Sequence, residues 1–423
     1  MDIQGLLNGR ECECGRTHRC EIKYVIIEDN AIARVGELAD AYKHILLVAD
    51  NNTYPICGDF VKYQLKDKCE NVLIYESEGL LVPNESAIDK MQQLLTNNTD
   101  LIIGIGSGVI QDLCKYVSFY AKLPYHIIAT APSMDGYASA GAAMITGNMK
   151  VTYSAHVPEA IIADVSILKN APMDMIRSGY GDILGKFSCL NDWKLSHVVN
   201  NEYLCDYVYD LTYDMLQRTK DLGKKLQERD PDAIKTLTEA LIGVGVAMAY
   251  MGNSRPASGS EHHLSHFFEV TGIMNNEPYF MHGTDVAFST VYTQRLREEL
   301  VKVNAPEQHS LFDEKTWSTE IRRIYSAAAE GVIDLQKKLG WYNKDYIRIY
   351  KEKWDDIVDV LKDAPSSDML IRYLKSVGLD ISDFEKTYGK EKIQNALWFA
   401  KDLKDRYSVL WLYYCLFYEQ ENQ

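Results

Sequence analysis

The sequence predicts an α/β protein in two parts, a doubly wound parallel-sheet domain over residues 1–170 and an all-helical domain over residues 171–423. Short apolar runs alternate with helical patterns in the first part, as in parallel sheets covered by helices. After Ala171-Pro172 the strand pattern ends, and long amphipathic helices with few prolines follow. Hydrophobic residues make up 46% and charged residues 25% of the 423 residues. This is the ordinary globular range, and the chain is long enough to bury a full core.

The predicted strands are near-continuous apolar runs, which indicates that both faces of the sheet are covered. They span residues 45–49, 72–75, 101–105 and 125–129. Between them, apolar residues at helical spacing predict a helix near residues 88–95 and a second from about residue 111 to 121.

The charge balance excludes some classes of function. The formal net charge is −15, which disfavours a general nucleic-acid binder because phosphate backbones need a cationic surface. An anionic substrate would therefore need a local cation. No signal peptide is evident, and the apolar runs near residues 240–251 and 407–418 are too short to span a bilayer. Nine cysteines give no disulfide pattern, which fits a reducing, cytoplasmic setting.

A glycine-rich turn follows the third predicted strand and opens a helix. It reads Gly104-Ile105-Gly106-Ser107-Gly108, with Asp112 four residues further on. Such turns let backbone N–H groups approach a phosphate at a helix N-terminus. The spacing departs from G-x-G-x-x-G, so a tight strand–helix connection remains the alternative.

Two further segments follow predicted strands and would line the same crevice. One is Thr130-Ala131-Pro132-Ser133-Met134-Asp135, after the strand at 125–129. The other begins at Asp50, after the strand at 45–49. Asp50 could accept the ribose hydroxyls of NAD and repel the 2′-phosphate of NADP, while the neutral Asn51 and Asn52 weaken that preference.

Two motifs suggest a metal. Asp182 lies between glycines in Gly179-Tyr180-Gly181-Asp182-Ile183-Leu184-Gly185-Lys186, and its alternative role is a helix cap. Four of the ten histidines lie within 21 residues, in Ser260-Glu261-His262-His263-Leu264-Ser265-His266 and at His282. His262 and His266 are spaced i,i+4 and share one helix face, a spacing that suits divalent transition metals. The alternative is a set of core or surface histidines.

A cysteine-rich segment stands near the N-terminus. Cys12, Cys14, His18 and Cys20 resemble a zinc knuckle. The C-x-C spacing is tighter than the C-x₂₋₄-C of most structural zinc sites, so the alternative is an N-terminal strand and turn.

Taken in order, these motifs resemble the bacterial and archaeal sn-glycerol-1-phosphate dehydrogenases. That family belongs to the superfamily of metal-dependent polyol dehydrogenases that includes glycerol dehydrogenase and 3-dehydroquinate synthase. The blocks that carry the resemblance are the Gly-Ser-Gly turn, residues 130–139, residues 181–186, Ser254-Arg255-Pro256-Ala257-Ser258-Gly259-Ser260-Glu261-His262, and His282-Gly283. The match runs from about residue 43 to 288, and the cysteine-rich start resembles the bacterial branch.

The resemblance implies a parallel-sheet nucleotide domain and a helical metal domain. It assigns Asp182, His262 and His282 as ligands of one divalent ion, although the neighbouring His263 leaves the first histidine open by one residue. His266 would supply the proton, and Asp135 would lie near nicotinamide and substrate. The cofactor-binding positions would be Gly106, Ser107, Gly108, Asp112, Thr130, Ser133 and Ser139.

The expected reaction is the reduction of dihydroxyacetone phosphate to sn-glycerol 1-phosphate with NAD(P)H. The phosphate needs a cation, and Arg255 suits it, helped by Ser254 and Ser258, with Lys186 as the alternative. A salt-bridged, structural Arg255 is the competing interpretation. Competing activities are a glycerol dehydrogenase-like oxidoreductase and a 3-dehydroquinate synthase-like cyclase. The ion could be zinc, nickel or iron, and the resemblance favours nickel or zinc and a homodimer.

Overall fold

The computed structural model describes residues 2–77, 79, 81–147, 149–307 and 312–419. The chain divides into two compact units. Unit one comprises residues 1–183 and 217–254, and unit two comprises residues 184–216 and 255–423.

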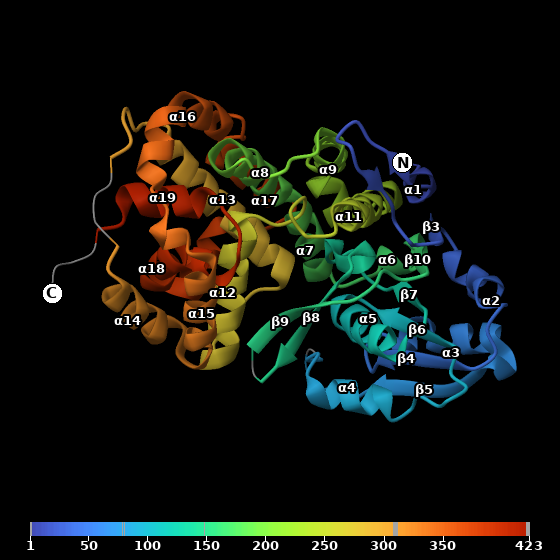
Figure 1. The fold of residues 1–423 in the computed structure, drawn as a ribbon. Coiled ribbons are helices and arrows are strands. Elements are labelled where there is room, and N and C mark those ends of the chain that lie inside the picture. Colours follow the sequence, from blue (N-terminus) through green and yellow to red (C-terminus); the bar gives the residue numbers. More distant parts are fainter. Residues whose placement is uncertain (1, 78, 80, 148, 308–311, 420–423) are drawn as a thin grey trace. The chain divides into compact units, whose positions relative to one another are not determined.

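Unit one is built on a six-stranded, fully parallel sheet (Figure 1). Its strand order is β3-β10-β7-β6-β4-β5. The strands are β3 (Tyr24–Glu28), β4 (Ile45–Asp50), β5 (Cys69–Tyr75), β6 (Leu101–Gly106), β7 (Tyr125–Ala129) and β10 (Ala160–Asp164). The four predicted strands are thus confirmed, and the sequence analysis missed β3 and β10. The sheet is doubly wound, as predicted.

Helices cover both faces of the sheet. Successive strand residues point to opposite sides, so each apolar strand presents side chains that must be buried on both faces. Leu47 and Ile103 pack on one side with Val61 of α3 (Tyr54–Leu65). On the other side Gly104 lies against Ile110 and Cys114 of α5 (Gly108–Ala121). The remaining elements of this part are η1 (Ala31–Arg34), α2 (Val35–Leu38), η2 (Lys66–Lys68), α4 (Glu85–Gln92) and α6 (Val165–Leu168).

Shorter elements complete unit one. The first residues form α1 (Ile3–Leu7) and a small hairpin of β1 (Arg10–Glu11) and β2 (Thr17–His18). A second antiparallel hairpin joins β8 (Gly141–Thr146) to β9 (Met149–Ser154). The helices are η3 (Asp135–Ala138), α7 (Met173–Leu184), whose last residue lies in unit two, α10 (Gly223–Gln227) and α11 (Pro231–Met251).

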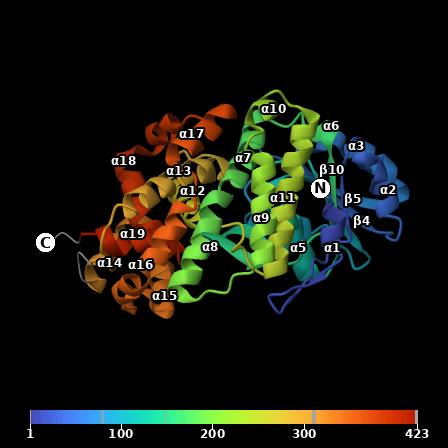
Figure 2. The same cartoon turned by 90° about the horizontal axis from the view of Figure 1, so that it is seen from above.

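The long helix α11 is visible along its length in Figure 2. It has 21 residues and is the one described helix long and apolar enough to cross a membrane, by length and composition only. It is longer than the apolar run identified in the sequence. However, 78% of its most apolar window is buried inside the protein, as expected for a core helix.

The described residues of unit two form helices and connecting loops, without a strand, and the helices are drawn in Figures 1 and 2. Its principal helices are α8 (Lys186–Asn200), α12 (Ser260–Asn275), α13 (His282–Leu300), α14 (Glu314–Tyr325), α15 (Ala329–Leu339), α16 (Tyr346–Lys362), α17 (Ser367–Ser376), α18 (Ile381–Phe399) and α19 (Val409–Phe417). Short η4 (Ser326–Ala328), η5 (Trp341–Asn343) and η6 (Ala400–Leu403) connect them. Its aromatic-rich core includes Tyr350, Tyr407 and Trp411.

The division differs from the single boundary expected near residue 170. Helices α7, α10 and α11 follow that boundary in sequence but pack with the sheet, and α9 (Asp206–Thr219) crosses the division. The close approach of α11 to η3 explains part of the difference, because a Cβ on Gly245 would lie 2.9 Å from the carbonyl oxygen of Asp135. An amphipathic pattern in the sequence indicates that one face of a helix is buried. It does not indicate whether that face packs in the sheet unit or in the helical unit.

Candidate functional site

The nucleotide crevice is expected where the strand order reverses. Strand β4 pairs with β5 on one side and with β6 on the other, so the chain changes direction across the sheet between β4 and β6. In doubly wound sheets, ligands bind outside the carboxyl ends of strands at such a switch point. Asp50 ends β4 and Gly106 ends β6. Two predicted cofactor residues therefore terminate the two strands that flank the switch point.

The three glycines of the turn differ in what they are needed for. A Cβ on Gly106 would lie 2.6 Å from Cβ of Ile110, and one on Gly104 would lie 2.9 Å from Sγ of Cys114. Both glycines are therefore required by packing of α5 on β6. A Cβ on Gly108 would meet nothing closer than Met134 at 3.8 Å. Packing does not explain Gly108, which leaves the open surface that a phosphate needs.

The start of α5 can receive an anion. Ser107 is its N-cap residue, and the Ser107 side chain makes no capping hydrogen bond to the helix. The first N–H groups of a helix have no intrahelical partner and carry partial positive charge. One turn later Asp112 forms an ion pair with Lys115 at 3.5 Å.

Lys115, which the sequence analysis did not identify, holds the loop after β7 (residues 130–141), which contains predicted cofactor-binding residues, to α5. It is fully buried, and its Nζ donates to Gly136 O at 3.0 Å, Ser139 Oγ at 3.1 Å and Gly141 O at 2.9 Å. Burial lowers the pKa of Lys115. The Ser139 hydroxyl in turn donates to Gly136 O. Ser139 is thus part of the loop's own hydrogen-bond network, in addition to its predicted role toward cofactor.

The loop after β7 is also held in place by contacts with β6 and α7. Thr130 donates its N–H to Gly106 O at 3.1 Å, which ties the two predicted cofactor segments together. The carbonyl of Ser133 accepts from Ser178 Oγ at 3.1 Å. A Cβ on Gly179 would lie only 1.8 Å from Pro132 O, so α7 approaches this loop as closely as backbones allow.

Asp182, the predicted carboxylate ligand, lies on α7 and is fully buried. Its Oδ2 accepts a hydrogen bond of 3.0 Å from the backbone N–H of Asp135. Asp182 is near the end of α7, so the structure gives it no role as an N-terminal helix cap. The hydrogen bond from Asp135 connects this predicted metal ligand to the predicted cofactor loop within unit one.

Asp50 has a structural role in its own turn. Its Oδ1 accepts from the N–H groups of Asn52 at 2.9 Å and Thr53 at 2.8 Å. The Asp50 N–H donates to Thr53 Oγ1. This arrangement shapes the connection from β4 to α3 and orients the carboxylate at the strand end.

In unit two the structure gathers three of the predicted histidines. The ring centroids of His262 and His282 are 5.1 Å apart, those of His266 and His282 are 5.5 Å apart, and those of His262 and His266 are 6.1 Å apart. His262 and His282 each offer a ring nitrogen within 4.8 Å of the other. The pair lies on neighbouring helices, α12 and the first residue of α13.

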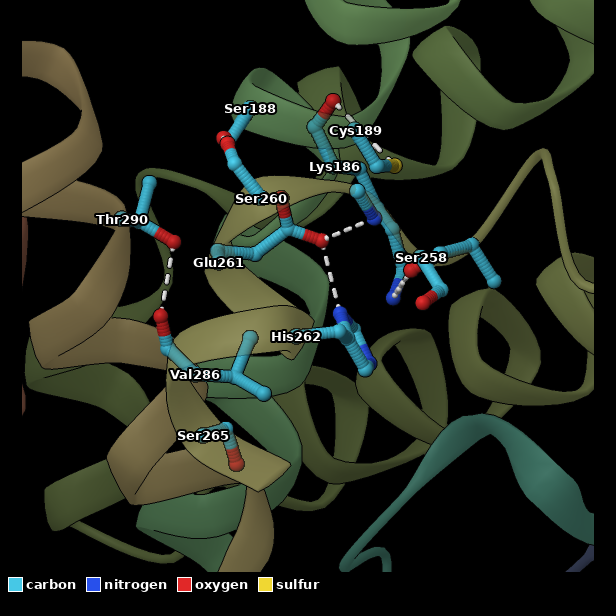
Figure 3. Close-up of polar contacts among 12 residues, drawn as sticks. Lys186, Ser188, Cys189, Ser258, Ser260, Glu261, His262, Ser265, Val286 and Thr290 are labelled. Carbon is cyan, nitrogen blue, oxygen red and sulfur yellow. Dashed lines mark hydrogen bonds and ion pairs between the residues drawn. The ribbon is translucent and has the colours of Figure 1, made fainter. Parts of the chain in front are cut away.

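The neighbour of His262 sets its tautomer (Figure 3). Nδ1 of His262 lies 2.7 Å from Oε1 of Glu261, which also accepts from the N–H of Gly259 at 2.8 Å. Burial alone would raise the pKa of Glu261, but the hydrogen bond and charge of His262 lower it. Because the carboxylate accepts, the proton sits on Nδ1, and Nε2 is left for a metal. Carboxylate–histidine pairs of this kind orient metal ligands.

The geometry distinguishes His263 from its neighbour His262. Both ring nitrogens of His263 are buried without a hydrogen-bond partner among the described residues. Burial lowers the pKa of His263 well below its usual value, and the charges of Lys404 and Arg406 lower it further. The histidine that lies beside His282 is His262.

A buried carboxylate fixes the start of α12. Asp192 accepts from the Ser260 N–H at 2.6 Å and from Arg297 at 2.7 Å. A Cβ on Gly259 would lie 2.7 Å from Asp192 Oδ2, so only glycine fits this approach. His262 and His266 thus lie on a helix, α12, whose first residue is held by a hydrogen bond to Asp192.

Arg255 is buried and paired. Its Nε lies 2.9 Å from Glu202 Oε1, and its Nη2 donates to the carbonyl oxygens of Asp192 and Tyr407. Lys186, the alternative cation, is also buried and donates to Ala257 O at 3.0 Å. These contacts agree with the structural interpretation of Arg255.

Two cations near Ser258 were not identified from the sequence. Lys404 Nζ lies 3.4 Å from Ser258 Oγ, and Arg406 donates to the Ser258 carbonyl oxygen at 2.6 Å. Burial lowers the pKa of Arg406 to about 10, and the nearby charge of Arg255 adds to this effect. The two residues lie about 140 positions after the motif, in a region with no recognisable pattern. The basic pair Lys404 and Arg406 was the only indication there.

Comparisons with known proteins agree with the fold. Residues 26–172 match the family described as iron-containing alcohol dehydrogenase. An archaeal alcohol dehydrogenase from a Red Sea brine pool shares the fold with a TM-score of 0.59 and 16% identity, over 92% of each chain. A probable glycerol dehydrogenase from Sinorhizobium meliloti shares it with a TM-score of 0.54 and 16% identity, over 84% of this chain and 97% of that one.

Curated relatives narrow the class. A Halalkalibacterium halodurans protein named as an NAD(P)+-dependent glycerol-1-phosphate dehydrogenase is 30% identical over 96% of this chain and 95% of its own length. A Pyrococcus furiosus protein of the same name is 30% identical over 67% of this chain and 83% of its own. The fold and site define a metal-dependent, NAD(P)-linked dehydrogenase of the alcohol dehydrogenase type. Within that class, the chain belongs to the glycerol-1-phosphate dehydrogenase family.

Proposed function

We propose that the protein reduces dihydroxyacetone phosphate to sn-glycerol 1-phosphate with NADH or NADPH, using one divalent metal ion, as its family membership supports. The observation that carries the metal chemistry is the pair His262 and His282, with His262 oriented by the buried Glu261. Three protein ligands would leave positions open for the substrate.

The proposed ion is held by Asp182, His262 and His282. One carboxylate and two imidazoles suit nickel, zinc or iron, and we favour nickel or zinc. When bound, the ion polarises the substrate carbonyl and the nicotinamide supplies a hydride to the carbonyl carbon.

The chain's own residues then have distinct tasks. His266, on the same helix face as His262, gives a proton to the carbonyl oxygen, either directly or through one water. The turn of Gly106, Ser107 and Gly108 receives the pyrophosphate at the N-terminus of α5. Asp135 positions nicotinamide and substrate. Asp112, Thr130, Ser133 and Ser139 shape the remainder of the cofactor site.

Asp50 directs the choice of cofactor in this proposal. Its Oδ1 is occupied by two backbone N–H groups, which fixes a negative charge at the end of β4. That charge would repel a 2′-phosphate, so we propose that NADH is preferred over NADPH.

The substrate phosphate is proposed to bind at the cation cluster around Ser258. Lys404 and Arg406 both contact this residue, and Arg255 adds a third positive charge in a protein with a net charge of −15. Arg255 itself contacts Glu202 and two carbonyl oxygens. Its part in phosphate binding is therefore supporting charge, with Ser254 and Ser258 as neighbours.

The test is an assay of purified protein loaded separately with Ni²⁺ and Zn²⁺. Dihydroxyacetone phosphate with NADH is expected to give sn-glycerol 1-phosphate, identified by an enantiomer-specific assay against sn-glycerol 3-phosphate. Glycerol with NAD⁺ serves as the comparison. Faster turnover of glycerol, or formation of the 3-phosphate, would refute the proposal. Sedimentation of the same sample tests the expected homodimer.

A further inference from the structure

The N-terminal hairpin carries a second cluster of metal-binding side chains. The loop between β1 and β2 presents Cys12 and Cys14, and β2 ends at His18. Cys12 Sγ, Cys14 Sγ and a ring nitrogen of His18 all lie within 4.8 Å of one another. We propose that these three residues bind a structural Zn²⁺ ion in unit one, independent of the dehydrogenase metal.

The spacing of the donors matches tetrahedral zinc. Cys14 Sγ lies 3.5 Å from Nε2 of His18. A sulfur about 2.3 Å and a nitrogen about 2.0 Å from the same tetrahedral zinc ion are about 3.5 Å apart. The observed separation is therefore that of two ligands of one ion.

The second nitrogen of His18 is arranged as in a metal ligand. Nδ1 lies 3.3 Å from the carbonyl oxygen of Tyr250, and the two rings stack with centroids 5.3 Å apart. A carbonyl only accepts, so the proton is on Nδ1 and the lone pair is on Nε2, toward Cys14. Metal-bound histidines almost always donate their other N–H in this way. His18 is also fully buried, which fixes the ring.

The backbone brings the two cysteines together. Cys12 accepts from the N–H of Gly15 at 2.9 Å and donates its own N–H to Arg16 O at 3.1 Å. Gly15 has a φ of +82°, in the region that favours glycine. This tight turn compensates for the short C-x-C spacing that argued against zinc in the sequence.

The hairpin has no apolar core of its own. Residues 9–19 contain no Val, Ile, Leu, Met, Phe, Tyr or Trp, and each strand has only two residues. Elements too small to bury apolar surface usually need a disulfide or a metal to hold them. The cysteines of the described residues form no disulfide, so a metal is the remaining means of holding this hairpin.

Structural zinc is usually four-coordinate, so a fourth donor completes the site. Single changes of the buried cysteines Cys20 and Cys205 to serine identify it, and if neither change matters the donor is a water.

The test measures bound metal by mass spectrometry and by cobalt spectroscopy in the full-length protein. In a His282→Ala background, we expect one equivalent of zinc to remain, and Cys12→Ser or Cys14→Ser to remove it. Cobalt in this background should show thiolate charge-transfer absorption, which a carboxylate–histidine site cannot give. Cys69→Ser, at a half-buried cysteine outside the cluster, is the control and should retain zinc.

Zinc should also protect Cys12 and Cys14 of the unmodified protein from alkylation, a measurement that needs no variant to fold. Equal alkylation with and without zinc, or cobalt spectra free of thiolate absorption, would overturn the proposal. The outcome is separate from the dehydrogenase assignment, because only this site contains sulfur ligands.

Discussion

The backbone N–H of Asp135 donates to Oδ2 of Asp182 across 3.0 Å. Both residues are buried, and they lie on different elements of unit one, η3 and α7. The contact couples the loop predicted to position nicotinamide to the carboxylate predicted to bind the metal. Charge and geometry at Asp182 can therefore be separated by experiment.

Asp182→Asn keeps an oxygen that can accept from Asp135 but removes the charge. We expect this variant to lose bound metal and activity while retaining NADH affinity. Asp182→Ala also removes the acceptor, which should cost about 1–3 kcal/mol of stability and weaken NADH binding. Metal analysis, calorimetry and NADH titration of both variants distinguish the roles. Full metal content in Asp182→Asn would contradict the ligand assignment.

In the proposed site, Glu261 would act on the metal through His262. Glu261→Gln replaces the carboxylate acceptor, and we expect metal affinity to fall about 10–100-fold, as is typical for such partners. His282→Ala should abolish activity and lower bound metal more completely. His44→Ala, at a partly exposed histidine of the sheet unit, is the control. The measurement is a competitive titration with a chelator, and unchanged affinity in Glu261→Gln would show that His262 is oriented by other means.

Gly108 is the glycine of the turn that packing leaves open. Gly108→Val should fold but weaken NADH binding about tenfold or more, because a side chain would occupy the surface where the phosphate approaches. Gly331→Val, at a position where a Cβ meets nothing within 4 Å, controls for the substitution itself. Fluorescence titration with NADH measures the effect. Wild-type affinity would mean that the turn is only structural.

Substrate specificity should depend on Arg406 more than on Arg255. Arg406→Leu is expected to cost about 1.5–3 kcal/mol, or roughly 10–150-fold in kcat/KM for dihydroxyacetone phosphate. Unphosphorylated dihydroxyacetone should be nearly unaffected. Arg255→Leu should instead lower Tm, because it removes a buried guanidinium together with its contacts to Glu202 and to the carbonyl oxygens of Asp192 and Tyr407. If Arg255→Leu selectively impairs the phosphorylated substrate, Arg255 binds the phosphate directly.

Acid should weaken unit one through Glu159. His126, whose Nε2 lies 3.5 Å from Oε1 of Glu159, lowers the pKa of Glu159 to about 2, and hydrogen bonds from Lys23 and Tyr42 contribute. A folded-state pKa below the unfolded value stabilises the protein above about pH 4.5, and this stability is lost as pH falls toward 2.

Glu159→Gln should therefore destabilise by about 1–3 kcal/mol at pH 7 and by progressively less below about pH 5. Urea unfolding at several pH values measures the difference, with Glu28→Gln at an exposed position as the control. A difference that does not depend on pH would exclude the ionised carboxylate as its source.

Local patterns in the sequence predicted the strands that line the switch point. β4, β6 and β7 are continuous apolar runs buried on both faces, so their composition alone identifies them. β3 was missed because Tyr24–Glu28 mixes exposed and buried positions. β10 was missed although Ala160–Asp164 is as long and as fully buried as β7, so its pattern was present in the sequence. The histidine cluster was predictable because three of its residues share one helix face or begin the next helix.

Long-range partners could not be predicted in the same way. Lys115 reads as one more charged residue in a helix, yet it is buried beneath three acceptors of a loop more than 20 residues away. Lys404 and Arg406 contact Ser258 only after the chain has formed seven further α-helices. Arg255 was proposed from its proximity in sequence to His262, and the structure pairs this buried arginine with Glu202, a partner that sequence spacing does not reveal.

The anchoring of Asp192 has a consequence for the chain's last helix. Asp192 Oδ1 also accepts from the N–H of Val409, the first residue of α19, while Oδ2 holds Ser260 at the start of the histidine helix. A single buried carboxylate thus joins two helix beginnings almost 150 residues apart. A truncation that removes residue 409 and those after it would take one hydrogen-bond donor from Asp192. We expect this to loosen the histidines of the proposed metal site, although none of them is changed. The segment from residue 409 onward therefore supports the proposed metal site from a distance, and we expect its removal to lower the amount of bound metal first.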